Sequence, residues 1–271
     1  MSLLSHVGLV GAGGLARATT TLSQRLFGLA VGIVCWVAVV GTVLAVLSWL
    51  VRRNFLYEGS IRAFEEERVP EGALLFLGSS TIRLWDTLAR DFSPWPVVNR
   101  GFGGAVVSQV VHFAPRLLPA SPAPRAVLFY CGGNDLAWGV SVASVVAGVE
   151  RFLAIARERL PGTPVYVLSV GKTPGRFLSW RRVDALNERL RALAEANGAR
   201  WVDVTTPMLG AGGRPQRALF LFDGIHPSAD GYAVWTSVLR PRLERDLARA
   251  VPLDAVLSVS VPACAGSAPS S

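Results

Sequence analysis

The sequence predicts an α/β fold: a three-layer α/β/α sandwich around a doubly wound, parallel sheet of five strands, preceded by one transmembrane helix. Two observations support this prediction. After residue 71, short continuous apolar runs alternate with longer amphipathic runs, which is typical of strands buried on both faces of a parallel sheet and joined by helices. Before them lies an uncharged run of 26 residues.

The uncharged run covers residues 26–51, and about 20 apolar residues suffice for a helix to cross a bilayer core. Arg25 precedes it, and Arg52 and Arg53 follow it. It has no polar stripe of the kind that a core helix of a soluble protein usually carries. A cleaved signal peptide fits less well, because the run is long, begins late and lacks an A-x-A-like site at its end. We therefore expect a single-pass protein of the bacterial inner-membrane type.

The remaining boundaries follow from composition. Residues 1–25 and 251–271 are rich in small and polar residues, and we expect both to be flexible. Residues 52–70 should form a linker or a juxtamembrane helix, and 71–250 the folded domain. Basic residues are almost equally frequent on both sides of the apolar run, so the side of the membrane that holds the domain stays open.

The predicted strands are five short apolar runs: Ala73–Leu77, Val97–Asn99, Ala126–Cys131, Val165–Ser169 and Arg200–Asp203. The predicted helices are Thr81–Arg90, Val106–Leu118, Val142–Leu160, Leu178–Asn197 and a last one from Ala229 to about Arg249. Gly198 should end the fourth helix, and Pro241 should break or kink the last. This order predicts a flavodoxin-like arrangement, in which ligands bind outside the carboxyl ends of the strands.

Charge and cysteine content exclude some classes of function. The net charge is +8, and 26 of the 27 basic residues are arginines, but they are scattered among acidic residues at helical spacing. This distribution favours solvated helix faces over a nucleic-acid surface. The three cysteines, Cys35, Cys131 and Cys264, show no metal-binding spacing. We expect no disulfide framework, no metal and no organic cofactor.

Polar residues follow the first two predicted strands. The first strand leads into Gly78-Ser79-Ser80, which would place a serine at a helix start, although serine is also an ordinary N-cap. The second leads into Asn99-Arg100-Gly101-Phe102-Gly103-Gly104. Its glycines could point backbone N–H groups at a ligand, or could form only a flexible turn.

Two further loops complete the set. After the third strand comes Gly132-Gly133-Asn134-Asp135, where Asn134 could donate to an oxyanion or simply stabilise a turn. Before the last helix, Asp223 stands three residues ahead of His226, as in a base held by an acid, although a surface-loop histidine is the alternative. His6 lies in the amino-terminal segment and His112 inside a predicted helix. Together, the hydroxyl, the amides, the asparagine and the Asp/His pair are the parts of a serine esterase.

From about Gly72 to Leu243 the chain resembles the SGNH hydrolase superfamily, also called GDSL esterases and lipases. All four of the family's blocks occur in order, and GSS-x-I-R-x-W followed by NRGFGG resembles the acetylhydrolase and lysophospholipase-like branch. The resemblance implies that Ser80 is the nucleophile, His226 the general base and Asp223 its orienting carboxylate. It also implies an oxyanion hole made by the N–H groups of Ser80 and Gly104 and by the Asn134 side chain. Ser79 stands where many relatives carry Asp, which leaves the support of the Ser80 turn open.

The predicted function is a membrane-anchored serine ester hydrolase that works through an acyl-enzyme, on a small-molecule, lipid or carbohydrate ester. One alternative is an acyl esterase or acyltransferase that acts on envelope carbohydrate, and another is a non-catalytic, flavodoxin-like binding module. Lys172 and Arg176 follow the fourth strand, and they could meet an anionic substrate or be solvated loop charges. The acyl chain, the alcohol and the oligomeric state are not determined by the sequence.

Overall fold

The structure, a computed structural model, describes residues 11–52 and 54–248, with side chains for 24–47 and 54–248. The chain divides into two units, Met1–Glu58 and Gly59–Ser271. The predicted flexible tail 251–271 and the first ten residues, which include His6, lie outside the described residues, as does Cys264.

The first unit contains one long helix, α1 (Gly11–Arg52), and the 3₁₀ turn η1 (Phe55–Tyr57). The helix begins well before the predicted start at residue 26 and includes residues 11–25, which the sequence placed in a flexible segment. Within it, Gln24–Leu47 has a mean hydropathy of 2.6 and no buried residue, so it is long and apolar enough to cross a membrane. A signal sequence near the amino terminus would have the same properties.

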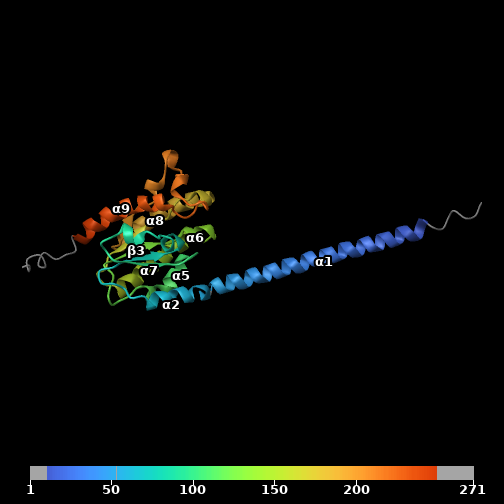
Figure 1. Cartoon of the computed structure of the whole chain (residues 1–271), viewed down its shortest axis with the longest axis horizontal. Coiled ribbons are helices and arrows are strands. Elements are labelled where there is room, and N and C mark those ends of the chain that lie inside the picture. The colour runs from blue at the N-terminus through green and yellow to red at the C-terminus, as the bar shows by residue number, and fades with distance from the viewer. Residues whose placement is uncertain (1–10, 53, 249–271) are drawn as a thin grey trace, which may run out of the picture. The chain divides into compact units, whose positions relative to one another are not determined.

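The second unit is built on a five-stranded parallel sheet, as predicted (Figure 1). The strands lie in the order β2-β1-β3-β4-β5. Their bounds are β1 Leu74–Gly78, β2 Val97–Gly101, β3 Ala126–Tyr130, β4 Val165–Leu168 and β5 Arg200–Val202. Gly78 is paired with Gly101 on one side and with Tyr130 on the other, so three strands end at the same level. The loops that follow them therefore converge.

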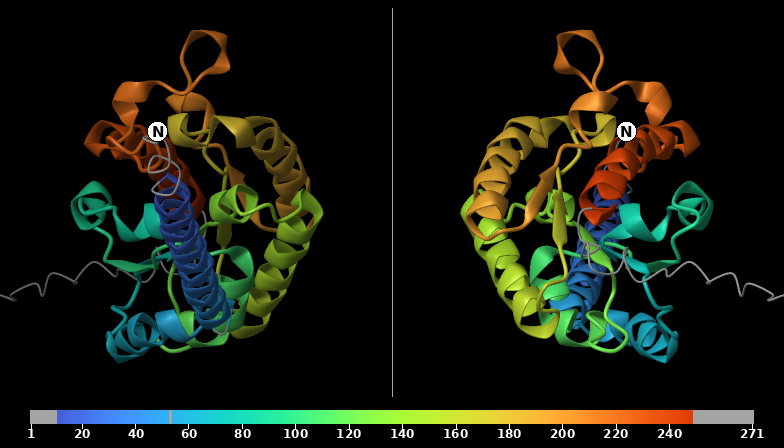
Figure 2. Two further views of the ribbon diagram at one scale, coloured as in Figure 1. Left: turned by 90° about the vertical axis from the view of Figure 1, so that its right-hand side faces the viewer. Right: turned by 90° about the vertical axis from the view of Figure 1, so that its left-hand side faces the viewer.

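Helices cover both faces of the sheet (Figure 2). Three helices pack side by side on one face: α5 (Val107–Leu117), α7 (Val142–Arg159) and α8 (Trp180–Ala196). The other face carries α9 (Ala229–Ala248) and the two short helices α3 (Ser80–Arg83) and α4 (Leu88–Asp91). Shorter elements complete the unit: α2 (Glu58–Glu66), α6 (Gly133–Ala137), η2 (Pro174–Ser179), η3 (Thr206–Met208), η4 (Ala211–Gly213) and η5 (Arg217–Leu219).

The predicted helix Thr81–Arg90 is wrong, because the structure has the two four-residue helices α3 and α4 instead. Tertiary packing explains the interruption. The Trp85 ring lies within an aromatic cluster, 4.9 Å from Tyr232 and 5.6 Å from Phe92, and its Nε1 donates to Asp91 over 2.8 Å. These contacts turn the chain between the two helices toward the sheet.

Two other helix predictions need correction. The start predicted at Leu178 belongs to η2, and α8 begins only at Trp180. The sequence predicts a break or kink of the last helix at Pro241, and the structure shows no break, since one helix continues through it. Its buried residues Trp235, Leu239 and Leu243 lie on both sides of the proline and belong to one core cluster, so packing on the sheet holds both halves in one helix.

Helix α2 falls within the predicted linker 52–70 but packs onto the folded unit. Ile61 is fully buried. The buried Arg100 donates to the carbonyl oxygens of Phe64 and Leu117 over 2.8 and 2.7 Å, and thereby joins α2 to α5. Burial lowers the pKa of this guanidinium, and the charges of Glu67 and Glu65 oppose that shift. The folded unit therefore includes α2.

Candidate active site

The Ser80 turn depends on the glycine that ends β1. Gly78 has φ +156°, and a Cβ at this position would lie 2.0 Å from the Tyr130 carbonyl oxygen. A side chain there would collide with β3, so glycine is required. The next residue, Ser79, donates its N–H to that same oxygen over 3.2 Å, and Ser80 becomes the first residue of α3. Because α3 has four residues, the helix dipole at Ser80 is smaller than the predicted ten-residue helix implied.

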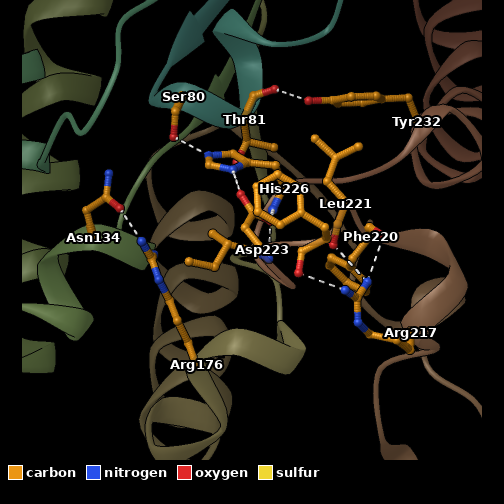
Figure 3. A network of polar contacts seen from close by, with 12 residues as sticks. Ser80, Thr81, Asn134, Arg176, Arg217, Phe220, Leu221, Asp223, His226 and Tyr232 are labelled. Carbon is orange, nitrogen blue, oxygen red and sulfur yellow. Dashed lines mark hydrogen bonds and ion pairs between the residues drawn. The ribbon is translucent and has the colours of Figure 1, made fainter.

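Side chains from outside the turn hold it in place. Asn99 donates to the Ile82 carbonyl over 2.8 Å and accepts from the Gly101 N–H over 3.0 Å, so it joins β2 to α3. Tyr232 of α9 donates to the Thr81 carbonyl over 2.8 Å (Figure 3). Tyr232 lies inside a predicted helix, and no sequence signal distinguished it. Contacts from β2 and from α9 thus hold the turn on both sides, with Ser79 in the position whose support the sequence left open.

Ser80, His226 and Asp223 lie in one hydrogen-bonded row (Figure 3). The Nε2 atom of His226 is 2.8 Å from Ser80 Oγ, and its Nδ1 is 2.6 Å from Asp223 Oδ2. A carboxylate beside Nδ1 favours the tautomer with the proton on that atom, which leaves Nε2 as the acceptor for the hydroxyl. The arrangement can therefore remove a proton from Ser80.

Backbone groups fix the Asp223 carboxylate. Its Oδ1 accepts from the N–H groups of Ile225 and His226, over 2.8 and 3.1 Å. Burial acts to raise the pKa of Asp223, but these hydrogen bonds and the interaction with His226 outweigh it and hold the pKa below its usual value. Arg217, which the sequence analysis missed, donates to the carbonyl oxygens of residues 220–222 and steadies the approach to this loop.

The loops after β1, β2 and β3 each offer a hydrogen-bond donor that the described residues do not fully use. Within the described part of the chain, the N–H groups of Ser80 and Gly104 meet no protein acceptor, and Gly104 adopts φ +74°, which suits glycine. Asn134 is 7% exposed and gives one Nδ2 hydrogen to the Ala105 carbonyl over 2.9 Å. Its Oδ1 faces Arg176 Nη2 at 2.8 Å (Figure 3). Because a guanidinium only donates, this contact fixes which end of the amide is oxygen.

Asp135 secures the loop that carries Asn134. It is 2% exposed, and both of its carboxylate oxygens accept from the Val107 N–H over 3.1 Å, so it joins α6 to the start of α5. Burial raises the pKa of Asp135 to about 6, although its backbone hydrogen bonds oppose the shift. In the sequence, Asp135 is visible only as the last residue of the Gly132-Gly133-Asn134-Asp135 motif, and no role was predicted for it.

The other charged residues that the sequence singled out lie in different surroundings. His112 is exposed on α5, where its ring packs edge-on against Phe113, away from Ser80. Lys172 forms an ion pair with Asp184 over 2.8 Å. Arg176 instead lines a pocket of about 20 Å³ together with Ser80, Asn134 and Thr173.

A sequence profile of the GDSL-like lipase/acylhydrolase family matches residues 76–234, more than half of the chain. The chain belongs to the GDSL-like lipase/acylhydrolase family. The GDSL-like domain therefore identifies the protein as an ester-bond hydrolase, in place of the non-catalytic binding module that the sequence left open. No curated protein matches the chain.

Solved structures resemble this GDSL-like hydrolase in fold. A protein from Streptococcus pneumonia, provisionally described as a platelet activating factor, is 20% identical, with a TM-score of 0.65 over 74% of this chain and 98% of its own. A GDSL-like lipase from Bacteroides thetaiotaomicron is 20% identical, with a TM-score of 0.58 over 70% and 96% of the two chains. A G-D-S-L family protein from Veillonella parvula is 18% identical, with a TM-score of 0.55 over 64% and 98%.

Proposed function

We propose that this hydrolase cleaves carboxylic esters through a Ser80-His226-Asp223 triad and a covalent acyl-enzyme. The observation that carries the proposal is the row from Ser80 Oγ to His226 Nε2 and from His226 Nδ1 to Asp223, with distances of 2.8 and 2.6 Å. A nucleophile, a base and a group that orients the base, each within hydrogen-bond reach, constitute an activated serine.

The proposed reaction has two stages. As Ser80 Oγ attacks the ester carbonyl carbon, its proton passes to His226 Nε2, and the Asp223 carboxylate stabilises the resulting imidazolium. The alcohol then leaves with that proton, and the acyl group stays on Ser80. Water, deprotonated by the same histidine, attacks the acyl-enzyme, releases the carboxylic acid and returns the proton to Ser80.

We infer that the oxyanion of each tetrahedral intermediate is bound by the N–H groups of Ser80 and Gly104 and by Asn134 Nδ2. Two observations support this inference: the two N–H groups meet no protein acceptor in the described residues, and Asn134 retains one amide hydrogen. Donors fixed before the reaction begins need no reorganisation as charge develops.

A panel of p-nitrophenyl esters from acetyl to palmitoyl, assayed on the full-length protein in detergent, tests the proposal. Ser80→Ala should lower kcat on the order of a million-fold, because a nucleophile and its base act as a unit. Ser79→Ala, which removes the adjacent hydroxyl, is the matched control and should retain most of the activity. Activity that survives in Ser80→Ala, or is lost only in Ser79→Ala, would contradict the assignment. Repeating the assay with a sugar acceptor distinguishes hydrolysis from acyl transfer.

We also propose that the apolar part of α1 anchors the protein in a membrane. The uncharged stretch of residues 26–51 and the absence of any buried residue in Gln24–Leu47 support this. The full-length protein should resist extraction by alkaline carbonate, and release into the supernatant would refute the anchor.

A truncation that starts at Arg52 keeps α2 and should be soluble and active. A truncation that starts at Gly72 is the matched control, because it removes α2 and exposes Arg100, and it should be less stable to heat. If both truncations melt at the same temperature, α2 is not part of the folded unit.

A further inference from the structure

The pocket beside Ser80 contains a cation, Arg176, without an ion pair at contact distance among the described side chains. Burial lowers the pKa of Arg176, and the charges of Tyr130 and, less strongly, Asp223 oppose that shift. Arg176 lies in η2 and is half-buried, and its Nη2 donates to Asn134 Oδ1 over 2.8 Å. Among the residues that the structure describes, no carboxylate forms an ion pair with it. A guanidinium carries five N–H donors in a fixed fork, and in the described part of the chain Asn134 Oδ1 is the one acceptor that they meet.

Lys172 lies four residues earlier on the same loop and differs in this respect. Its ammonium is neutralised by Asp184 at 2.8 Å, and it lines a different cavity. The loop after β4 thus carries two cations, of which Lys172 forms an ion pair and Arg176 lines the same pocket as Ser80. A half-buried charge loses hydration without a partner, which is costly unless a ligand supplies one.

A second, independent observation points to the same pocket. Thr173 is 7% exposed and lines this pocket with Ser80 and Arg176. Its Oγ1 is buried and has no hydrogen-bond partner among the described residues. Buried hydroxyls are rarely left without a partner, so Thr173 Oγ1 has a hydrogen-bonding capacity that the described residues leave unused.

The loop that carries both residues is fixed against the triad. Gly175 donates its N–H to the Gly224 carbonyl over 2.7 Å, and a Cβ at Gly175 would lie 2.7 Å from the Asp223 carbonyl oxygen. The main chain of this loop is therefore fixed against the loop that carries Asp223, and the hydrogen bond to Asn134 Oδ1 orients the guanidinium. With a volume of about 20 Å³, the pocket is small, so the group that it admits beside Ser80 is a small one.

Building on the proposed esterase function, we propose that Arg176 and Thr173 form a subsite for an anionic oxygen, that of a carboxylate or a phosphate, carried by the ester substrate close to the scissile bond. The guanidinium donates to this oxygen while it also holds the Asn134 amide, and the Thr173 hydroxyl donates a further hydrogen bond. The enzyme therefore prefers esters with a negative charge near the reacting carbonyl over neutral esters of the same shape.

Two pairs of substrates test the subsite with the full-length protein in detergent. The first pair, the p-nitrophenyl esters of succinate and levulinate, places a carboxylate or a neutral ketone on the acyl side. The second pair, 3-carboxyphenyl and 3-carbamoylphenyl acetate, places the charge on the alcohol side. The measured quantity is the ratio of kcat/KM for the charged ester to kcat/KM for its neutral partner. Intrinsic reactivity cancels when this ratio is compared between variants.

In at least one pair, Arg176→Gln should lower the ratio about ten- to a hundred-fold, the range expected for loss of a charged hydrogen bond. Lys172→Gln, which removes a charge from the same loop, should leave both ratios unchanged. If Arg176→Gln does not fold, Thr173→Val should still lower the ratio severalfold.

Equal losses on charged and neutral esters in Arg176→Gln would overturn the subsite, because they would leave this residue only as a positioning group for Asn134. A similar fall of the kcat/KM ratio in Lys172→Gln would overturn the subsite as well. It would show that the preference depends on the total positive charge of the loop and not on contact with Arg176. Failure of the proposed esterase function is distinguishable from both, since it would appear as neutral-ester hydrolysis that persists in Ser80→Ala.

Discussion

The two ends of the sheet differ: the larger cavity lies at one end, and the candidate catalytic residues lie at the other. At the amino ends of β4 and β5 lies a cavity of about 300 Å³, lined by Pro164, Asn197 and Arg200. Its polar contacts are of an ordinary structural kind, such as the donation from Arg157 to the Asn197 carbonyl over 3.0 Å. At the carboxyl ends the pocket measures only about 20 Å³, yet it adjoins Ser80, His226 and Asn134. The lining of the larger cavity includes no nucleophile paired with a base, so we propose that the chemistry takes place at the carboxyl ends.

Replacing the two histidines of the folded unit one at a time should give the largest difference in kcat, and it tests whether the candidate site at the carboxyl ends is correct. His226→Ala should lower kcat by roughly the same factor as Ser80→Ala, on the order of a million-fold, because neither acts without the other. His112→Ala should change kcat less than twofold, since this histidine is exposed on α5. Kinetics of both variants on a short-chain ester decide the matter, and an inactive His112→Ala beside an active His226→Ala would exclude the triad.

Replacing Asn134 should have an intermediate effect on kcat. Asn134→Ala should lower kcat by about a hundred- to a thousand-fold, the usual cost of one oxyanion donor, with little change in KM. Arg157→Ala, at the opposite end of the sheet, is the matched control and should leave kcat unchanged. A rise in KM at constant kcat in Asn134→Ala would show that this side chain binds the ground state rather than the oxyanion.

Asp135, which lies beside Asn134 at the carboxyl ends, should make the free energy of unfolding depend on pH. Its pKa is raised to about 6 in the folded state against an ordinary value of 3.8, so between these pH values the folded protein binds more protons than the unfolded chain. The free energy of unfolding should therefore fall as pH rises from about 4 to 6, by roughly 2 kcal/mol from this group, out of roughly 3 kcal/mol over its whole titration range.

Asp135→Asn should remove this fall, and the exposed Asp230→Asn should preserve it. Chemical denaturation at pH 4, 5 and 6.5 measures the difference. If wild type and Asp135→Asn have the same pH dependence, burial does not raise the pKa of Asp135.

Most of the fold could be predicted because the strands are short apolar runs between turn residues, a local signal. The break between α3 and α4 could not, because it depends on contacts of Trp85 with Tyr232, which is distant in the sequence. The triad candidates were found because each follows or precedes a predicted element in a recognisable block. The roles of Tyr232 and Arg217 were missed, because their hydrogen bonds go to backbone carbonyls that no sequence pattern marks. The difference between Lys172 and Arg176 likewise depends on Asp184, which belongs to another element.

Covalent trapping tests the central claim, that Ser80 is the nucleophile, most directly. The full-length protein would be treated with a fluorophosphonate, which phosphonylates an activated serine, and the modified peptide would be located by mass spectrometry. The account predicts a single adduct on Ser80, absent from Ser80→Ala and strongly slowed in His226→Ala, with Ser79 unmodified. An adduct on Ser79 or another serine, or labelling of Ser80 at an unchanged rate in His226→Ala, would contradict it.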